Sequence, residues 1–324
     1  MTTLTRLAIL DDYQGVALEM GPWSRLPGLQ VEAFRDALAD EDALAARLLP
    51  FDAILGIRER TPFPASLIRR LPNLKLLMTT GERNRSFDVA AANAAGITVC
   101  GTPSAGAPTV DITWGLILSL LRDLPAQTAS LRAGTWQASG GANSIGRAAE
   151  GLTLGILGLG KLGTRVAKVG QAFGMKTIAW SRNLTAEAAA AVGVERVEKA
   201  ALFERADVVT LHLILSPQSR GIVGAEELGR MQPDAVIVNT SRGPLIDQPA
   251  LIAALAARRI GGAGLDVFDQ EPLPANHPIL AAPNTVLTPH LGYVSRQNFS
   301  AYFEGAVATI EAYRAGAPVR VLTP

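Results

Sequence analysis

The chain is poor in the residues that bind metal ions or cross-link a fold. Its 324 residues include one cysteine, Cys100, and three histidines. A single cysteine excludes an internal disulfide, and no group of histidines and cysteines has the spacing of a zinc site. We therefore expect no metal site, and we interpret Cys100 as a small core residue.

The chain also lacks an excess of charge and any long apolar run. Its 30 basic and 29 acidic residues leave a net charge of +1, so no strong field favours nucleic acid or a membrane surface. No apolar stretch is long enough for a transmembrane helix without charged residues or prolines. The N-terminal stretch lacks the apolar segment of a signal peptide. We expect a cytoplasmic protein that binds neither nucleic acid nor membranes.

Apolar residues make up 48% of the chain, which is enough for two globular domains with their own cores. Short apolar runs alternate with helix-like stretches, and this alternation predicts parallel sheets covered by helices. The predicted strands are 6–10, 29–34, 53–57, 74–79, 98–100, 152–157, 177–180, 208–213, 235–240, 264–268 and 286–287. The predicted helices are 41–49, 65–71, 87–95, 111–121, 125–132, a helix running to 173, 225–231, 248–258 and 295–315, with a polar loop at 139–146.

A glycine-rich turn follows the apolar run 152–157. In a GxGxxG pattern the first glycine makes a tight turn, the second lets the backbone approach a pyrophosphate, and the third lets the next helix pack on the strand. The first amides of that helix then point at the phosphates. The pattern alone is weak evidence, but the strand at 177–180 follows at the distance of a βαβ unit. We predict a dinucleotide site at Gly158, Gly160, Lys161, Leu162 and Gly163.

These features predict an α/β fold of two doubly wound parallel-sheet domains. The glycine turn marks residues 102–292 as a Rossmann nucleotide domain. The long helix predicted at 295–315 can return to the first domain, so residues 1–101 and 293–324 would form a flavodoxin-like substrate domain. The nucleotide domain is then inserted in the substrate domain, and the two crossings would act as a hinge.

Three chemically complementary side chains follow predicted strands: Arg242, Glu271 and His290. They lie at carboxyl ends of parallel strands, the edge where ligands bind. An arginine can hold a carboxylate through two parallel hydrogen bonds. A histidine can protonate a carbonyl oxygen near neutral pH, and a neighbouring carboxylate stabilises its protonated ring. Beside a nicotinamide, this set predicts a site that reduces 2-oxo acids.

Two loops in the first hundred residues carry arginines just after predicted strands, at 58–60 and 81–85. A substrate can bind at such positions, although exposed surface charge explains any single arginine equally well. Gly81 could offer a close backbone N–H to an anion.

Four motifs occur in a specific order along the chain. They are GLGKLG at 158–163, NTSRGPLID at 239–247, GAGLDVFDQEPLP at 262–274 and TPHLG at 288–292. With these motifs the chain resembles the D-isomer-specific 2-hydroxyacid dehydrogenase family, which includes glyoxylate/hydroxypyruvate reductases and phosphoglycerate dehydrogenases. The resemblance covers nearly the whole chain, and the ordered set is far more specific than any one motif.

The resemblance implies an NAD(P)-dependent D-2-hydroxyacid dehydrogenase that forms a homodimer. It implies that Arg242 orients the substrate, that His290 is the general acid/base and that Glu271 is its partner. It implies that Asp266 faces the nicotinamide carboxamide, where a capped loop carboxylate is the alternative. The remaining implied positions are His212 and Thr240 for the cofactor, the Gly81 backbone for the substrate carboxylate, and Arg58 with Arg60 for a distal anionic group.

The chain departs from the family pattern at the position that contacts the adenosine ribose of the cofactor. NAD-type members usually have aspartate there, which accepts hydrogen bonds from the 2′-hydroxyl and repels a 2′-phosphate. This chain has Ser181 followed by Arg182, which favours NADP slightly over NAD; the alternative is that Arg182 points to solvent. Two further departures are Ile214, where many members have proline, and Asp111, where many have glutamate.

Two hypotheses of function follow. The first is an oxidoreductase that moves a hydride between NAD(P)H and a 2-oxo or D-2-hydroxy acid. The second is a non-catalytic sensor or corepressor that binds the dinucleotide on the same fold, since fold does not fix function. The complete set of Arg242, Glu271 and His290 favours the enzyme, because a sensor does not need all three.

Overall fold

The structure, a computed structural model, describes residues 3–137 and 145–324. It contains two compact units: unit 1 comprises the chain up to Gly106 together with Ser295–Pro324, and unit 2 comprises Ala107–Val294. The predicted loop at 139–146 lies largely outside the described residues.

The unit boundaries lie further along the chain than the predicted 101/102 and 292/293. Residues just after 101 are bound within unit 1, which is why they belong to it. The Thr102 N–H donates to the Gly81 carbonyl oxygen at 2.9 Å. The Ala105 N–H donates to the Asn298 side-chain oxygen at 2.9 Å. Hydrogen bonds between residues this far apart in the chain leave no sign in the hydrophobic pattern, so the sequence alone does not locate this boundary.

The sheet of unit 1 has the strand order β2-β1-β3-β4-β5 in the part of the chain that is described. All of its strand pairs are parallel. This is the flavodoxin-like order, so the prediction for this unit is confirmed. The strands are β1 (Arg6–Leu10), β2 (Gln30–Ala33), β3 (Ala53–Gly56), β4 (Leu76–Thr79) and β5 (Thr98–Gly101).

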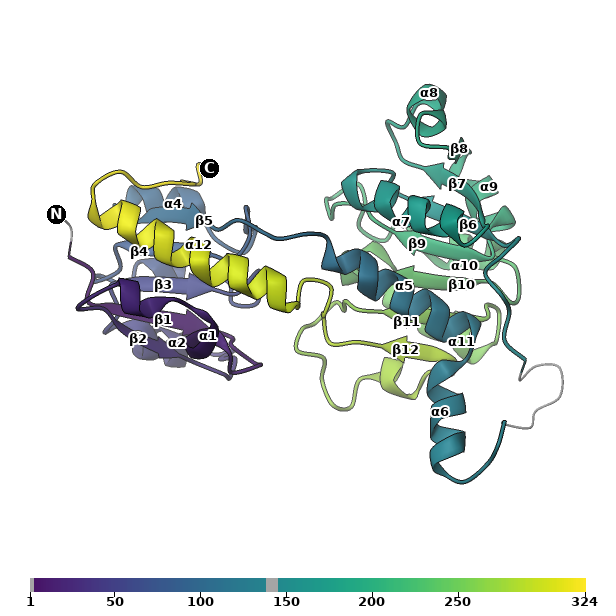
Figure 1. Cartoon of the computed structure of the whole chain (residues 1–324), viewed down its shortest axis with the longest axis horizontal. Helices are drawn as coiled ribbons and strands as arrows, with labels where there is room; N and C mark the ends of the chain where they lie inside the picture. The colour runs from purple at the N-terminus through teal and green to yellow at the C-terminus, as the bar shows by residue number, and fades with distance from the viewer. Residues whose placement is uncertain (1–2, 138–144) are drawn as a thin grey trace. The chain divides into compact units, whose positions relative to one another are not determined.

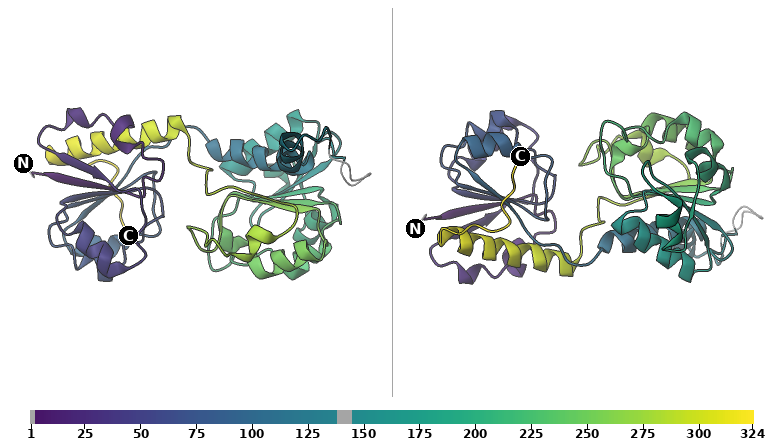
Figure 2. Two further views of the ribbon diagram at one scale, coloured as in Figure 1. Left: turned by 90° about the horizontal axis from the view of Figure 1, so that it is seen from below. Right: turned by 90° about the horizontal axis from the view of Figure 1, so that it is seen from above.

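Helices cover both faces of this sheet (Figure 2). The side chains of Leu44, Leu67 and Ala92 form part of one core beneath α2, α3 and α4. The opposite face is covered by α1 and α12 (Figure 1), where Phe303 of α12 is fully buried. The helices are α1 (Ala17–Met20), α2 (Glu41–Leu48), α3 (Ala65–Ile68), α4 (Val89–Ala94) and α12 (Arg296–Arg314).

The sheet of unit 2 has the order β12-β11-β10-β9-β6-β7-β8 over the described residues, with parallel pairing throughout. This is the Rossmann order with one further strand, and the chain reverses direction across the sheet between β6 and β9. The strands are β6 (Thr153–Leu157), β7 (Lys176–Trp180), β8 (Glu195–Arg196), β9 (Val208–Leu211), β10 (Val236–Asn239), β11 (Gly262–Leu265) and β12 (Thr285–Leu287). The fold-class prediction is confirmed, although the two exposed residues of β8 gave no strand signal.

The helices of unit 2 also form two layers. One core, with Trp114, Ile117 and Val166, lies beneath α5 and α7. The other core, with Phe203 and Leu251, lies beneath α9, α10 and α11. The helices are α5 (Pro108–Leu121), α6 (Leu124–Arg132), α7 (Lys161–Ala172), α8 (Ala186–Ala190), α9 (Lys199–Arg205), α10 (Ala225–Arg230) and α11 (Gln248–Ala256).

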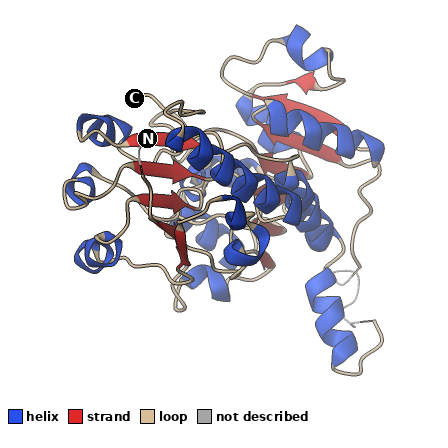
Figure 3. Ribbon diagram, turned by 60° about the vertical axis from the view of Figure 1, so that its left-hand side comes forward, coloured by secondary structure: helices blue, strands red, loops and turns tan. Residues whose placement is uncertain are grey.

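Helix α6 differs from the other helices of unit 2 because it has no buried residue. It extends from the end of α5, away from the sheet of its unit (Figures 1 and 3). None of the helices in the described ranges is long and apolar enough to span a membrane.

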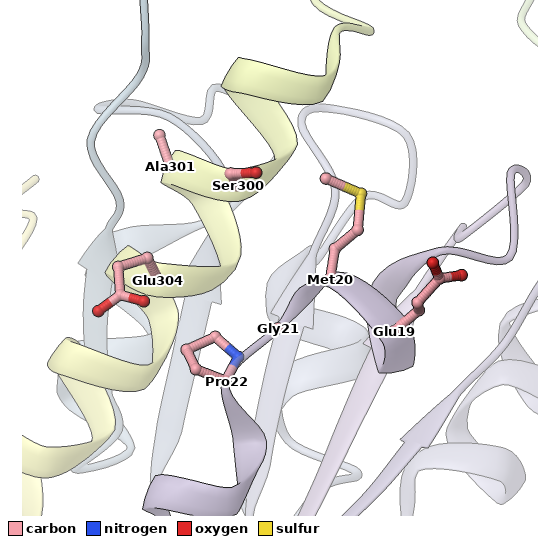
Figure 4. A pocket seen from close by; sticks show the side chains of 7 residues that line it. All are labelled: Glu19, Met20, Gly21, Pro22, Ser300, Ala301 and Glu304. Carbon is pink, nitrogen blue, oxygen red and sulfur yellow. The ribbon is translucent and has the colours of Figure 1, made fainter.

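A hollow of about 490 Å³ lies in unit 1 between α1 and α12. It is lined by Glu19, Met20, Gly21, Pro22, Ser300, Ala301 and Glu304 (Figure 4). None of the residues predicted to bind substrate or cofactor lines it, because most of those residues lie near the ends of strands.

Candidate active site

The three glycines of the turn after β6 have different surroundings. Gly158 has φ +102°, a conformation that favours glycine, and a Cβ there would lie 2.6 Å from the His212 carbonyl oxygen. A Cβ on Gly163 would lie 2.1 Å from the Gly158 carbonyl oxygen. A Cβ on Gly160 would meet nothing within 4 Å. The first and third glycines are therefore required by the fold, whereas the second leaves an open backbone surface.

That open surface adjoins the start of α7. Gly160 is the N-cap and gives no side-chain cap, and Lys161 begins the helix. The first amides of a helix have no partner within the helix, and its dipole favours negative charge. The turn therefore suits the pyrophosphate of a dinucleotide, in the position that the sequence predicted for it.

Ser181 follows β7 and is bound to the glycine turn. Its Oγ accepts a hydrogen bond from the Leu159 N–H at 3.1 Å. Arg182 is exposed, and within the described residues it has no ion pair or hydrogen-bond partner. A cation thus follows Ser181 at the end of β7, on the edge of the sheet that carries the glycine turn.

The three histidines have different surroundings, and only some of these surroundings suit an acid/base role. Burial lowers the pKa of His212 to about 4, so its ring is neutral at physiological pH. Its Nε2 lies 3.0 Å from Thr210 Oγ1. Among the described residues, none forms a hydrogen bond with its buried Nδ1. His277 Nδ1 accepts from the Ile279 N–H at 3.2 Å and caps a short 3₁₀ helix. His290 is the histidine with a carboxylate partner.

His290 and Glu271 form a close pair. His290 Nδ1 lies 2.5 Å from Glu271 Oε2, and Glu271 Oε1 accepts from the Phe268 N–H at 2.8 Å. Burial raises the pKa of Glu271, but the hydrogen bond and charge of His290, the Phe268 N–H and the charge of Arg242 outweigh it, so the net pKa is lowered. The carboxylate is therefore ionised and accepts the Nδ1 proton. This leaves Nε2 for exchange with a ligand.

Arg242 is held by the strand that precedes it. The Asn239 side chain donates to the Arg242 carbonyl oxygen at 2.9 Å and accepts from the Ser241 N–H at 3.0 Å. A Cβ on Gly243 would lie 2.1 Å from the Phe268 carbonyl carbon. Glycine at 243 thus lets the Arg242 loop pack directly on the loop that leads to Glu271.

Asp266 binds the loop that carries His290. Its side chain is fully buried, and it accepts from Thr288 Oγ1 at 2.6 Å, from the Leu291 N–H at 2.6 Å and from the Gly292 N–H at 2.7 Å. Burial raises its pKa more than these donors lower it. The contacts are those of a loop-binding carboxylate, while contact with a nicotinamide carboxamide stays a prediction.

Thr240 and Gly81 make internal contacts that the sequence did not reveal. Thr240 is buried, and its Oγ1 lies 2.8 Å from Thr113 Oγ1 of α5. The Gly81 N–H, which we expected to face a substrate carboxylate, donates to Thr102 Oγ1 at 2.9 Å. A substrate carboxylate would need this N–H unpaired, but it is already hydrogen-bonded within unit 1.

Arg58 and Arg60 follow β3 in unit 1. Arg58 has φ +56° and donates through its guanidinium to the Thr80 carbonyl oxygen at 3.1 Å. A Cβ on Gly81 would lie 2.0 Å from the Arg58 Nη1, so glycine at 81 makes room for this arginine. Arg60 donates to the Asp11 carbonyl oxygen and lies over the Tyr13 ring at 4.2 Å.

The sequence did not single out Thr109 and Thr113 of α5, yet both touch loops of the site. Thr109 Oγ1 donates to the Gly292 carbonyl oxygen at 2.7 Å. The available signal was two threonines one helical turn apart in a largely apolar helix. Across the described ranges, no group of three or more histidine, cysteine or acidic residues is placed to hold a metal ion.

Fold and site together define an α/β protein with a Rossmann unit. At one edge of its sheet lie a pyrophosphate-type turn and the set of Arg242, Glu271 and His290. Residues 114–292 match the D-isomer specific 2-hydroxyacid dehydrogenase, NAD binding domain. The chain belongs to the D-isomer specific 2-hydroxyacid dehydrogenase family, as its motifs predicted, and its Rossmann unit is a domain that binds a nicotinamide dinucleotide.

Relatives of the chain carry dehydrogenase and reductase names. It is 37% identical over 284 residues to a D-3-phosphoglycerate dehydrogenase of Methanocaldococcus jannaschii, covering 87% of this chain and 51% of that protein. It is 36% identical over 250 residues to a hydroxypyruvate reductase of Thermotoga maritima, covering 76% and 79%. A phosphoglycerate oxidoreductase structure from Vibrio cholerae O395 matches with a TM-score of 0.91 and 39% identity, covering 97% and 100%. The match with the first of these spans about half of that relative.

Replacing the second and third glycines by alanine separates folding from cofactor binding. We expect Gly163→Ala to destabilise unit 2 strongly, because its Cβ would meet the Gly158 carbonyl oxygen. We expect Gly160→Ala to melt like the wild type, since its Cβ has open space, but to bind NAD(P)H at least about tenfold more weakly because the methyl group meets the pyrophosphate. Thermal melting and fluorescence titration check both. Wild-type affinity in Gly160→Ala would contradict this assignment of the turn.

Proposed function

We propose that the protein transfers a hydride between NAD(P)H and a small 2-oxo acid, and in reverse oxidises a D-2-hydroxy acid. The observation that carries the proposal is the His290–Glu271 hydrogen bond, next to the Arg242 loop at the ligand edge of a nicotinamide-binding unit. This reduction needs a general acid, a carboxylate that supports the acid, and a cation that holds the substrate carboxylate.

Each residue has a defined part in the reduction. The bound nicotinamide supplies the hydride that C2 of the 2-oxo acid accepts. Arg242 holds the substrate carboxylate through paired charge-assisted hydrogen bonds. Protonated His290 donates the Nε2 proton to the carbonyl oxygen and is left neutral, to be reprotonated from solvent. Glu271 keeps the proton on Nδ1 and stabilises the protonated ring.

We infer that two arginines of unit 1 contribute to substrate binding, in addition to Arg242 of unit 2. Arg58 and Arg60 would bind a distal anionic group of the substrate. Their planar donors suit a carboxylate or phosphate. The proposal agrees with the names of relatives that act on phosphoglycerate and hydroxypyruvate. The Gly81 contribution is then space for the Arg58 guanidinium rather than a free N–H.

We propose that NADP is preferred over NAD. Ser181 Oγ accepts the Leu159 N–H, and its hydroxyl proton can be donated to a ligand. Exposed Arg182 adds a cation beside it. A hydroxyl donor and a guanidinium suit a 2′-phosphate, whereas the 2′-hydroxyl of NAD is best bound by an acceptor.

We further propose that the protein is a homodimer that pairs through α6. This helix has no buried residue, yet it carries Leu124 at 47% and Leu131 at 57% exposure, and Trp136 follows at 80%. Apolar side chains gathered on one projecting element are typical of an interface. A second copy of α6 offers the same apolar surface, as a two-fold interface requires.

The acid/base role of His290 is tested by His290→Gln. We expect kcat for reduction to fall by about 10²-fold or more, which is the usual contribution of a general acid, with unchanged affinity for NAD(P)H. The measurement is absorbance loss with glyoxylate, hydroxypyruvate, pyruvate, phenylpyruvate and 2-oxoglutarate. His277→Gln is the control and should retain activity. Wild-type turnover in His290→Gln would remove the residue from the mechanism, and no turnover by the wild type would overturn the proposed activity.

The cofactor preference is tested by comparing kcat/KM for NADPH and NADH. We expect the wild type to favour NADPH and Arg182→Ala to lose about tenfold of that preference, since a charged hydrogen bond contributes about 1.5–3 kcal/mol. Ser181→Asp should shift the preference to NADH through repulsion of the 2′-phosphate. Lys176→Ala, which removes a cation at the other end of β7, is the control. A wild type that prefers NADH would contradict this proposal but not the dehydrogenase activity.

The dimer is tested by light scattering after size-exclusion chromatography. We expect the 34.0 kDa chain to elute at twice its mass and Leu131→Glu with Trp136→Glu to elute at the mass of one chain, because buried unpaired carboxylates are costly. Leu18→Glu, at an exposed leucine of unit 1, is the control and should leave the mass unchanged. A monomeric wild type, or a dimer that tolerates both glutamates, would disprove pairing through α6.

A further inference from the structure

The backbone at His290 needs support from outside its own segment. His290 has φ +53°, a left-handed conformation that side chains other than glycine adopt at a cost. Such a conformation persists only when surrounding contacts determine it. The contacts of residues 288–292 are therefore part of what keeps the imidazole beside Glu271.

The Gly292 peptide is bound on both sides. Its N–H donates to Asp266 at 2.7 Å, and its carbonyl oxygen accepts from Thr109 Oγ1 at 2.7 Å. A Cβ on Gly292 would lie 3.3 Å from Thr109 Oγ1 and Cγ2, so the loop packs closely on this threonine. Asp266 thus supports the N–H side of the loop, and Thr109 supports the carbonyl side.

Thr109 is itself held by α5. The helix packs on β10, β11 and β12 (Figure 1), and buried Trp114 and Ile117 anchor it in the core. One turn after Thr109, Thr113 Oγ1 donates to the Thr109 carbonyl oxygen at 2.7 Å and lies 2.8 Å from Thr240 Oγ1. Thr240 directly precedes the Ser241–Arg242 segment. One helix face therefore touches both the His290 loop and the Arg242 loop.

We infer that Thr109 is a positioning residue for His290. Its hydroxyl holds the Gly292 carbonyl and so keeps residues 288–292 in the conformation in which His290 Nδ1 reaches Glu271. The inference rests on the proposed function only for its effect on turnover, because the His290–Glu271 pair can be observed without substrate.

The test compares the wild type with Thr109→Val, which keeps the branched shape but removes the donor, and Thr109→Ser, which restores the hydroxyl. Thr177→Val is the matched control. Thr177 Oγ1 also donates to a loop carbonyl of unit 2, that of Gly193 at 3.2 Å, but touches no site residue. The readouts are kcat, the Kd for NAD(P)H, thermal melting and the low-field proton resonance of His290 Nδ1–H, assigned by its absence in His290→Gln.

We expect Thr109→Val to lose or broaden the Nδ1–H resonance and to lower kcat by about tenfold to a hundredfold, as small misplacements of catalytic groups do. Its Kd for NAD(P)H should stay that of the wild type. Thr109→Ser and Thr177→Val should keep both the resonance and the turnover.

Thr109→Val with an unchanged resonance would overturn the inference, as would a serine variant that is as impaired as the valine variant. No low-field resonance in the wild type would also overturn it, because the ordered pair would be absent. A wild type that shows the resonance but reduces no 2-oxo acid would refute the proposed function alone. The resonance in Thr109→Val would then still decide the role of Thr109.

Discussion

The buried carboxylate of Asp266 is the interaction on which the candidate site depends. A buried acidic group is costly unless it is hydrogen-bonded, and Asp266 meets this requirement with one hydroxyl and two amides of residues 288–292. The same bonds determine the path of a loop whose central residue has a left-handed backbone. The His290–Glu271 contact is thus the outcome of hydrogen bonding beneath the surface rather than of the pair alone.

Close backbone contacts supply the second constraint. Gly158, Gly163 and Gly243 each lie where a Cβ would overlap a neighbouring backbone, and together they bring the phosphate turn, the Arg242 loop and the Glu271 loop to one sheet edge. Parallel strands place their carboxyl ends at that edge, where ligands bind in open α/β sheets. Glycine is thus required at 158 and 163 because a Cβ would overlap the neighbouring backbone. At 160 its lack of a side chain leaves open backbone for a ligand.

The sequence predicted both sheets and the set of Arg242, Glu271 and His290, because apolar runs and strand-end positions are local signals. It did not predict α1, β8, α8 or α9, which span two to seven residues each. It could not show that the Gly81 N–H donates to Thr102, that Ser181 holds the glycine turn, or that α5 supports the His290 loop. Each of these contacts joins residues far apart in the chain through a side-chain hydroxyl, and hydroxyl contacts leave no periodic pattern.

We propose that the protein moves a hydride to C2 of a 2-oxo acid on the face that gives a D-2-hydroxy acid. The most direct measurement uses NADPH or NADH deuterated at C4 with hydroxypyruvate, followed by isotope and chiral analysis of the product. We expect deuterium at C2 of the D product when one of the two hydrogen positions at C4 is labelled, and none when the other is. Formation of the L product, or of a product without the label from either C4 position, would contradict it.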